Sequence, residues 1–374
     1  MSNNNAVDTV MSMDLPLILH KKNSLATVGN QQMVNFTSND YLGFSDNEEL
    51  KAHVKHALDL YGLGATGSRR LSGNHQVYLE TEAHIARWIG KPAGVMFNSG
   101  YQMNGAIFST LASKSSLIIT DKLIHASIID GVQNSEAQLV RFRHNDVHHL
   151  SQVLKKYAHN KTDIYIVIES IYSMDGDMSP LAAIIELKKQ YQATLIVDEA
   201  HSIGLYGNGG NGWVNQHNGL DDVDVMLLAF GKSFGLSGAM LVSNQEIVQR
   251  MKAKCRSYIY STALPLPIAS GIKKASEIIS ERNDLNEKLN ENIRLFKTLI
   301  STTSNTQIQP IIIGDKDTAI QVERELLEKG FFCRSVHHPT VPKGESRLRI
   351  TITSAHTATQ IKALAEAINN AFVQ

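Results

Sequence analysis

The sequence feature that most constrains the fold is a series of short apolar runs, each bounded by Gly, Asp or Ser. They span residues 94–97, 117–120, 164–168, 194–197 and 225–228. Helix-length segments lie between them, such as 146–158 and 180–192. Short apolar runs are typical of buried strands, and strands that alternate with helices predict an α/β domain with a mostly parallel sheet. In such sheets the loops at the carboxyl ends of the strands carry the functional residues.

The chain of 374 residues is too long for one small core, and its character changes twice. Its first 30 or so residues are polar and irregular, so we expect an N-terminal arm over 1–38 and a large domain over 39–267. Charged helical segments and two strand-like runs then predict a smaller C-terminal α+β domain over 268–374. At one predicted helix start, Ser179 is the expected N-cap and Pro180 the first helical residue.

Composition excludes several classes of partner. Lys+Arg and Asp+Glu both number 36, and this zero net charge argues against nucleic acid or an anionic membrane. Two cysteines, Cys255 and Cys333, are too few for a disulfide framework or a four-thiolate site, so we expect a reducing compartment and no metal. No apolar run approaches the ~18 residues that span a membrane. Because Met1–Asn5 lacks the basic start of a secretory signal, the expected location is the cytoplasm.

Lys232 carries the strongest chemical signal. It lies between Gly231 and Ser233, just after the run 225–228, and the preceding run ends in an acid and a histidine, Asp198 and His201. A lysine amine can form a Schiff base with an aldehyde. A carboxylate can pair with a pyridinium nitrogen and keep the ring an electron sink, while a histidine touches the ring or its phenolic oxygen. The pattern indicates pyridoxal 5'-phosphate (PLP) as the cofactor.

Two other interpretations of these residues are weaker. Asp198–His201 matches a helicase box, and Gly231–Ser233 matches the end of a phosphate-binding loop. That loop requires a glycine five residues before the second one, where this chain has Met226, and the acidic box comes before the lysine. An ordinary surface lysine would not explain the glycines on both sides of it, Gly231 and Gly235, or the partner pair Asp198 and His201.

Three further predicted strand ends carry polar residues. Gly100 and Tyr101 lie on a strand-to-helix turn, where backbone N–H groups can bind an anion. His125 follows the run 117–120, where an aromatic ring can stack on a pyridine ring. Hydroxyls and carboxylates gather in Glu169–Asp177 after a third strand. Each is also typical of an ordinary turn or cap, but their shared position at strand ends favours one site.

A set of segments matches one family of enzymes over about nine-tenths of the chain. They are Asn35–Gly43, Gly67–Gly73, Phe97–Tyr101, His125–Ser127, Ser173–Asp177, Val197–His201, Phe230–Lys232, Ser261–Pro265, and Pro339–Pro342 followed by Arg347–Arg349. With these segments the chain resembles the α-oxoamine synthase family of fold-type I PLP-dependent transferases. The resemblance implies a large domain with a mostly parallel sheet and a smaller C-terminal α+β domain.

The resemblance also implies roles at the cofactor. Lys232 would bind PLP and move the α-proton, Asp198 would pair with the ring nitrogen, and His201 would hydrogen-bond the phenolic oxygen. His125 would stack on the ring.

Further residues would meet the phosphate and the substrates. Gly100 and Tyr101 would contact the phosphate, and Thr262 would reach the phosphate of the neighbouring subunit, since sites in this family lie at a homodimer interface. Ser173 and Glu169 would lie near the cofactor. Asn39 and Arg349 would hold the amino-acid carboxylate, for which a guanidinium suits a planar anion, and Thr340 would touch the acyl substrate.

The sequence departs from the family at two places. Three residues before the lysine the family has a hydroxyl that meets the phosphate, where this chain has Ala229. The N-terminal arm is shorter than in the family, so the resemblance does not place the basic residue that meets the far end of the acyl chain; Lys21 and Lys22 are both candidates.

The reaction implied is the condensation of L-alanine with a pimeloyl thioester, with loss of CO2 and the thiol, in biotin biosynthesis. Pimeloyl-CoA and pimeloyl-acyl carrier protein both remain open as donors; the basic stretch 250–256 suits an acidic carrier or a solvated helix face. Glycine C-acetyltransferase (2-amino-3-ketobutyrate CoA ligase) or another family member is the nearest alternative. A PLP lyase or aminotransferase fits the cofactor residues equally well, and a non-catalytic structural family member should have lost them.

Overall fold

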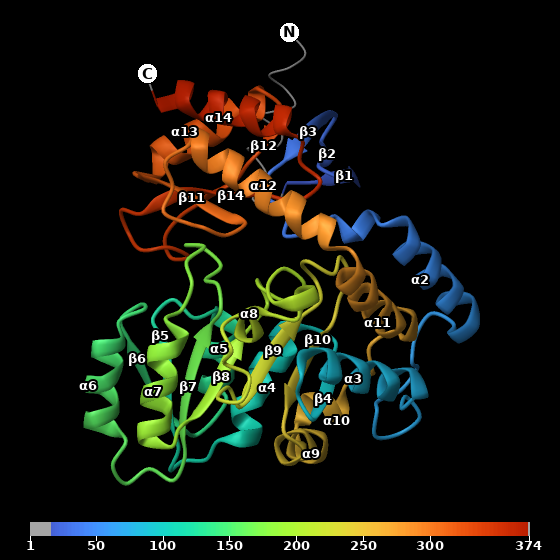
Figure 1. Cartoon of the computed structure of the whole chain (residues 1–374), viewed down its shortest axis with the longest axis vertical. Helices are drawn as coiled ribbons and strands as arrows, with labels where there is room; N and C mark the ends of the chain where they lie inside the picture. Colours follow the sequence, from blue (N-terminus) through green and yellow to red (C-terminus); the bar gives the residue numbers. More distant parts are fainter. Residues whose placement is uncertain (1–15, 373–374) are drawn as a thin grey trace. The chain divides into compact units, whose positions relative to one another are not determined.

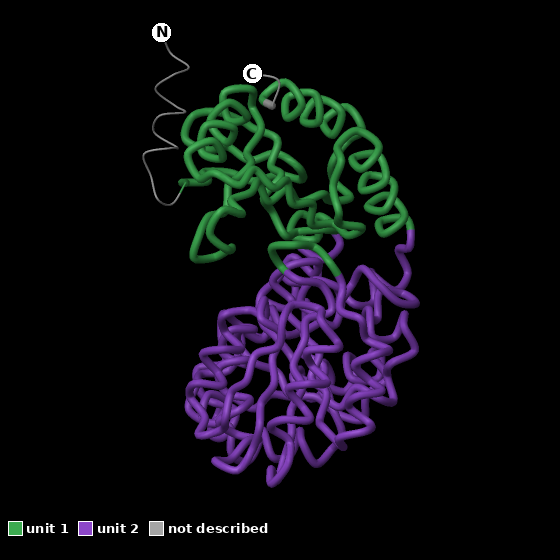
Figure 2. The backbone as a smooth tube through the Cα atoms, turned by 90° about the vertical axis from the view of Figure 1, so that its left-hand side faces the viewer, with its two compact units in different colours: residues 1–46, 173–177, 284–374 green, residues 47–172, 178–283 purple. Residues whose placement is uncertain are grey.

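The structure, a computed structural model, describes residues 16–372. The chain forms two compact units (Figure 2). The larger unit comprises residues 47–172 and 178–283, and the smaller comprises 16–46, 173–177 and 284–372. The expected absence of a secretory signal at Met1–Asn5, and the part of the expected arm before Pro16, lie outside the described residues.

The larger unit is built on a mixed sheet that confirms the predicted α/β architecture (Figure 1). Antiparallel pairing is confined to β10 and its two neighbours, β4 and β9, and the remaining pairs are parallel. All the runs predicted as strands are strands, whereas β6 and β10 were not predicted. In spatial order the strands are β4 (Ala93–Phe97), β10 (Ala239–Ser243), β9 (Val225–Ala229), β8 (Thr194–Asp198), β7 (Ile164–Glu169), β5 (Leu117–Asp121) and β6 (Gln138–Phe142).

Helices cover this sheet. Side chains of α4, α5, α9 and α10 form one buried apolar core with the strands, in which Phe108, Ile128 and Met251 pack with Val95 and Leu227. The helices of the unit are α2 (Glu48–Tyr61), α3 (Gln76–Ile89), α4 (Gly100–Leu111), α5 (Ala126–Gln133), α6 (Val147–Tyr157), α7 (Leu181–Tyr191), α8 (Trp213–Gln216), α9 (Gln245–Lys254), α10 (Arg256–Tyr260) and α11 (Leu266–Glu281). Because β4, β5, β7, β8 and β9 run in one direction, their carboxyl ends share one edge of the sheet.

One predicted helix start is wrong by a residue. The N-cap of α7 is Pro180, which makes no side-chain capping bond. The hydroxyl of Ser179 instead donates to the carbonyl of Glu169 at 2.8 Å and so ties the loop after β7 back to its strand.

The smaller unit contains two sheets. One has the order β1 (Ile18–Lys22), β2 (Leu25–Val28), β3 (Gln31–Asn35), β12 (Phe331–Phe332), and the other the order β11 (Ile308–Gly314), β14 (Ser346–Thr351), β13 (Ser335–Val336). Its helices are α12 (Asn283–Leu299), α13 (Lys316–Glu328) and α14 (Ala358–Phe372). The first residue of α12, Asn283, still belongs to the larger unit. Within the first 30 residues, which were expected to be irregular, β1 and β2 form because Ala26 and Val28 pack with Leu327 and Phe332, which are distant in sequence.

The limits of the units differ from the domain limits expected from the sequence. Helix α11 belongs to the larger unit, where it packs on α2 and α3. The short segment 173–177 belongs to the smaller unit because the chain's C-terminal third binds it. The hydroxyls of Ser304 and Thr306 each donate to the Gly176 carbonyl at 2.9 Å.

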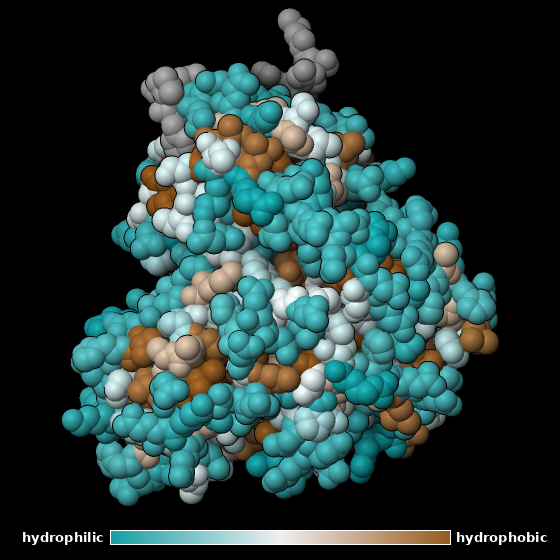
Figure 3. Space-filling model, viewed as in Figure 1, coloured by the Kyte–Doolittle hydropathy of each residue, from teal (hydrophilic) through white to brown (hydrophobic). Residues whose placement is uncertain are grey.

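Across residues 16–372 no helix combines the length and the apolar character needed to cross a bilayer. The face drawn in Figure 3 is mostly hydrophilic, with its apolar residues in separate groups.

A buried histidine in the smaller unit predicts acid sensitivity. His356 is 1% exposed; its Nδ1 accepts the Thr353 N–H at 3.0 Å, and its Nε2–H donates to the Asn35 carbonyl at 3.0 Å. Its ring stacks on Phe36 with 4.1 Å between centroids. Burial lowers the pKa of His356 to about 4. In the unfolded chain this group titrates near 6.5, so between the two values the unfolded state binds the extra proton.

Stability should therefore fall as the pH drops from about 6.5 to 4, by about 3 kcal/mol for this group, since each pKa unit is worth about 1.4 kcal/mol. Urea unfolding at several pH values measures this dependence, and His356→Gln should flatten it. Equal pH dependence in the wild type and the variant would contradict this assignment.

Candidate active site

Lys232 and His201 meet at the carboxyl edge of the sheet in the larger unit. Lys232 lies three residues beyond β9, and its Nζ is 2.7 Å from the Nε2 of His201, which follows β8. The turn that carries the lysine is fixed, because the Ser233 hydroxyl donates to the Ile203 carbonyl at 2.5 Å. The pairing predicted from two strand ends is therefore present in the structure.

Two buried carboxylates lie at the ends of neighbouring strands. Asp198 and Glu169 are paired in register on β8 and β7. Asp198 accepts the Ala200 N–H at 2.9 Å and an N–H of the Asn104 amide at 3.3 Å. Burial, and then the negative charge of Asp198, raise the pKa of Glu169 well above its usual value. Glu169 thus keeps its proton to higher pH than an ordinary glutamate.

His125 caps the amino end of α5 beside these carboxylates. Its backbone N–H donates to Glu169 Oε1 at 2.6 Å, and its Nδ1 accepts the Ser127 N–H at 3.2 Å. Solvent reaches the residue, but the surrounding chain lowers the pKa of its ring by desolvation; the Lys232 charge acts the same way and Asp198 opposes it. An accessible, neutral imidazole ring results.

The amino end of α4 forms a candidate anion site. The first N–H groups of a helix have no partner within the helix and attract anions. The helix begins at Gly100, and Ser99 caps it by accepting the Gln102 N–H at 3.2 Å. A Cβ on Gly100 would come within 3.7 Å of the Ala229 Cβ, so the end of β9 lies against this turn. Tyr101 is 54% exposed, and its hydroxyl bonds to Asp130.

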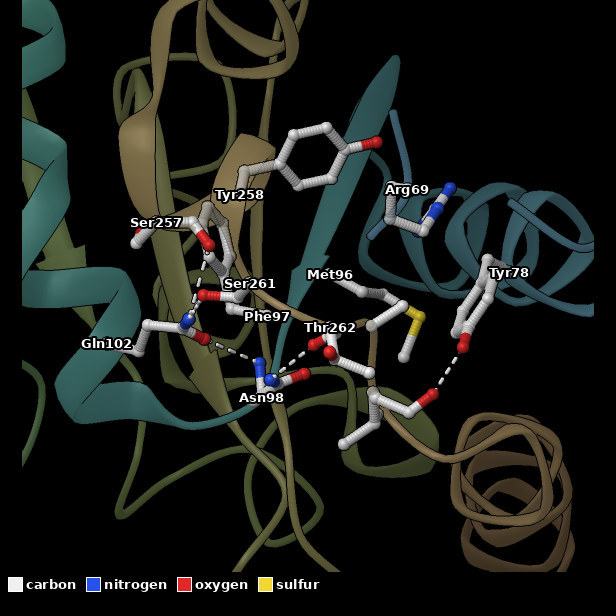
Figure 4. A pocket seen from close by; sticks show the side chains of 12 residues that line it. Arg69, Tyr78, Met96, Phe97, Asn98, Gln102, Ser257, Tyr258, Ser261 and Thr262 are labelled. Atoms are coloured by element: carbon white, nitrogen blue, oxygen red, sulfur yellow. Dashed lines mark hydrogen bonds between the residues drawn. The ribbon is translucent and has the colours of Figure 1, made fainter. Parts of the chain in front are cut away.

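Thr262 lies close to the same turn (Figure 4). Its carbonyl accepts from the Asn98 side-chain amide at 2.8 Å. The Gln102 side chain accepts the Asn98 N–H at 3.0 Å and donates to the Ser261 hydroxyl at 2.7 Å. The segment around Thr262 is thereby fixed to the turn between β4 and α4, and the threonine itself is exposed.

The smaller unit contains a second polar cluster. Arg349 on β14 donates from Nη2 to Asn39 Oδ1 at 3.1 Å and from Nε to the Ser173 carbonyl at 2.6 Å. The buried Tyr41 hydroxyl also donates to Asn39 Oδ1, at 3.2 Å. Three residues predicted to handle substrate or cofactor, Asn39, Ser173 and Arg349, are thus joined within one unit.

Thr340 is not joined to that cluster by any hydrogen bond of the described residues. It is exposed on the turn after β13, where its N–H donates to the His337 carbonyl at 3.0 Å. Of the two candidate lysines, Lys21 bonds to Asp40 at 3.2 Å and to Ser45 at 3.1 Å, whereas Lys22 is exposed.

Two buried residues of the site were not predicted. Asn104 and Ser127 connect Asp198 with His125 through hydrogen bonds of 3.3, 3.0 and 2.7 Å. A Ser two residues after a helix-capping His was a usable signal for Ser127. The position of the Asn104 side chain depends on which face of α4 packs on the sheet. Sequence spacing alone did not predict that face.

The sheet order and a lysine, acid and histidines at its carboxyl edge define the class, a fold-type I PLP-dependent transferase. The chain belongs to the aminotransferase class I and II family, whose model matches residues 31–368. An 8-amino-7-oxononanoate synthase of Buchnera aphidicola subsp. Baizongia pistaciae is 37% identical over 352 residues, 92% of this chain and 91% of that protein.

Two solved structures extend the comparison. Serine palmitoyltransferase from S. paucimobilis with a bound PLP–myriocin aldimine superposes with a TM-score of 0.93 at 28% identity, over 99% of this chain and 95% of that one. An 8-amino-7-oxononanoate synthase from Francisella tularensis gives 0.77 at 30% identity, over 90% and 97%. The resemblance to α-oxoamine synthases is confirmed.

Proposed function

We propose that this enzyme condenses L-alanine with a pimeloyl thioester to give 8-amino-7-oxononanoate, CO2 and the thiol, in biotin biosynthesis. The observation that carries the chemistry is the contact between Lys232 and His201 beside the buried Asp198. The choice of substrates rests on the relatives named 8-amino-7-oxononanoate synthase, which match about nine-tenths of the chain.

The residues of the larger unit fit PLP. They offer an amine at Lys232, a buried carboxylate at Asp198, an accessible imidazole at His125 and a helix amino end at Gly100 for a phosphate. When bound, PLP supplies an aldehyde that condenses with amines and a ring that accepts the electrons of a carbanion.

Each residue then has a proposed task. Lys232 would hold the cofactor through its amine and would remove the α-proton of the amino acid as general base. Asp198 would pair with the ring nitrogen, since an adjacent negative charge favours the protonated form. His201 would serve the phenolic oxygen, and His125 would serve the ring. Glu169, which fixes the His125 backbone at 2.6 Å, positions that ring.

The smaller unit has the proposed substrate groups. Arg349 and Asn39 would hold the carboxylate of the amino acid, since a guanidinium suits a planar anion. Ser173 would lie beside the reacting carbons and Thr340 beside the acyl group. The guanidinium of Arg349 is held by Ser173 and Asn39, so its orientation is fixed before a substrate arrives.

Two sister reactions compete with this assignment. Structural similarity to serine palmitoyltransferase favours L-serine with a long-chain acyl thioester as the second candidate. Glycine with acetyl-CoA, the glycine C-acetyltransferase reaction, is the other. Thiol release by the purified PLP-loaded protein, from pimeloyl-, palmitoyl- and acetyl-CoA with alanine, serine or glycine, separates all three. Release from pimeloyl-CoA with alanine alone supports the proposal, and preference for another pair contradicts it.

Two cations that could meet an acidic carrier protein bond within the chain instead. In the basic stretch 250–256, the Arg250 guanidinium donates to the carbonyls of Thr110 and Leu111 at 3.1 and 3.0 Å, and Lys252 bonds to Glu82 at 2.7 Å. These two cations are therefore engaged within the chain, which favours a structural role for the stretch. Pimeloyl-CoA is the donor we propose.

We also propose a homodimer in which Thr262 reaches the partner's phosphate. Large apolar side chains of the larger unit are exposed around α2 and α3; Leu60, Leu63 and Leu71 are 62%, 83% and 85% exposed. Exposed apolar groups of this kind mark protein interfaces. Light scattering on the purified protein tests the dimer.

The alanine at position 229 predicts a gain of cofactor affinity on substitution. Ala229→Ser places a hydroxyl beside the amino end of α4, where Ala229 and Gly100 are neighbours. One hydrogen bond is worth about 0.5–1.5 kcal/mol, so PLP should bind about 2- to 13-fold more tightly, as measured by equilibrium dialysis. Ala112→Ser, at the other end of α4, is the control. Unchanged affinity in the Ala229 variant would place the phosphate elsewhere.

A further inference from the structure

A buried hydrogen-bond chain leads from Asp198 to His125. The side-chain amide of Asn104 donates to Asp198 Oδ2 at 3.3 Å and to the Ser127 hydroxyl at 3.0 Å. The hydroxyl in turn is 2.7 Å from His125 Nδ1. Asn104 and Ser127 are 4% and 1% exposed, so water does not compete for these bonds.

The donors and acceptors of this chain follow from its two ends. An ionised carboxylate only accepts hydrogen bonds, so the group of Asn104 that faces Asp198 is its NH2, which has a second hydrogen for Ser127. The Ser127 oxygen therefore accepts from Asn104, and its own hydrogen is directed to His125.

At the other end, the state of the imidazole is fixed. The backbone N–H of Ser127 can only donate, and it donates to His125 Nδ1 at 3.2 Å. A ring nitrogen that accepts hydrogen bonds has no proton, so a neutral His125 must have its proton on Nε2. Two donors from one residue also fix the plane of the ring.

We infer that Asn104 and Ser127 are positioning residues that hold His125 as its Nε2-protonated tautomer and tie the orientation of its ring to the Asp198 carboxylate. The effect of this arrangement on turnover rests on the proposed function. The tautomer of His125, in contrast, is a property of the protein without cofactor or substrate. The ring proposed to cover the cofactor is thereby kept uncharged and oriented by two buried residues.

The first test is NMR of the PLP-free, 15N-histidine-labelled protein. The His125 signal is assigned by its absence from H125N. The wild type should show a proton on Nε2 and none on Nδ1. A proton on Nδ1 would overturn the inference without any further variant.

Variants then test each hydrogen bond between Asp198 and His125. Ser127→Ala removes a donor to Nδ1, so the pKa of His125 should rise by about 0.4–1 unit, the equivalent of one hydrogen bond. Ser127→Thr keeps the hydroxyl and should restore the wild-type titration. Asn104→Leu should shift the pKa in the same direction, and Ser135→Ala, whose hydroxyl bonds to the Val132 carbonyl at the far end of α5, should not.

Turnover is read separately on the PLP-loaded proteins. Ser127→Ala and Asn104→Leu should lower kcat several-fold, with Ser127→Thr rescued. A wild type that releases no thiol would overturn the proposed function and leave the titration test intact. A shift in Ser127→Ala without one in Asn104→Leu would overturn the link to Asp198, and wild-type titration in both would overturn the inference as a whole.

Discussion

Replacing Lys232 with alanine should lower kcat/KM for thiol release by at least about 10³-fold. General acid–base catalysis alone contributes about 10²–10⁴-fold, and the same amine is proposed to hold the cofactor covalently. The Nζ of Lys232 lies 2.7 Å from the Nε2 of His201 at the carboxyl edge of the sheet, where the cofactor is proposed to bind. The measurement is thiol release by wild-type and variant protein, each saturated with PLP.

A matched control separates this effect from a change in charge. Lys254→Ala removes an exposed lysine from the end of α9 and should leave the rate unchanged. The variant of Lys232 should also lose the visible absorbance of lysine-bound PLP. Full turnover in that variant would remove the general-base mechanism and favour a non-catalytic role for this lysine.

Replacing Asp198 with asparagine should lower kcat by about 10²–10³-fold, the range seen when one preorganised electrostatic partner is removed. Asp198 is 7% exposed and anchored by Ala200 and Asn104, so its charge faces the site with little solvent screening. The amide keeps the shape of the side chain but does not favour a protonated ring nitrogen.

The control for this variant is Asp221→Asn, which neutralises an exposed carboxylate before β9. Circular dichroism should show the same fold for all three proteins. A higher KM for the amino acid with an unchanged kcat would show that Asp198 acts in binding and not on the electronics of the cofactor.

The sheet of the larger unit could be predicted because its central strands are buried on both faces. Such strands are continuous apolar runs, as in Leu195–Val197 and Val225–Leu228. Strand β6 is half exposed and includes Arg141, so it has no such run. Residues 18–35 were missed for another reason, since their apolar partners are in the C-terminal part of the chain.

The same distinction applies to the site. Lys232, Asp198 and His125 each follow an apolar run, so their meeting at one sheet edge could be expected from sequence alone. The bond from Arg349 to the Ser173 carbonyl could not, because it depends on a loop that leaves one unit and joins another. Asn104 was missed because its role depends on helix rotation within a packed core.

The parallel pairing of β3 with β12 sets the order in which the two units of this protein fold during its synthesis. Val34 lies beside Phe331, nearly three hundred positions later in the chain. At a synthesis rate of about 5–20 residues per second, the first strands wait roughly 15–60 s for this partner. The larger unit is complete on the ribosome before then, since it ends at Asn283. The smaller unit closes last, and until it does the apolar side chains of Ala26, Val28 and Met33 stay open to other chains or to a chaperone.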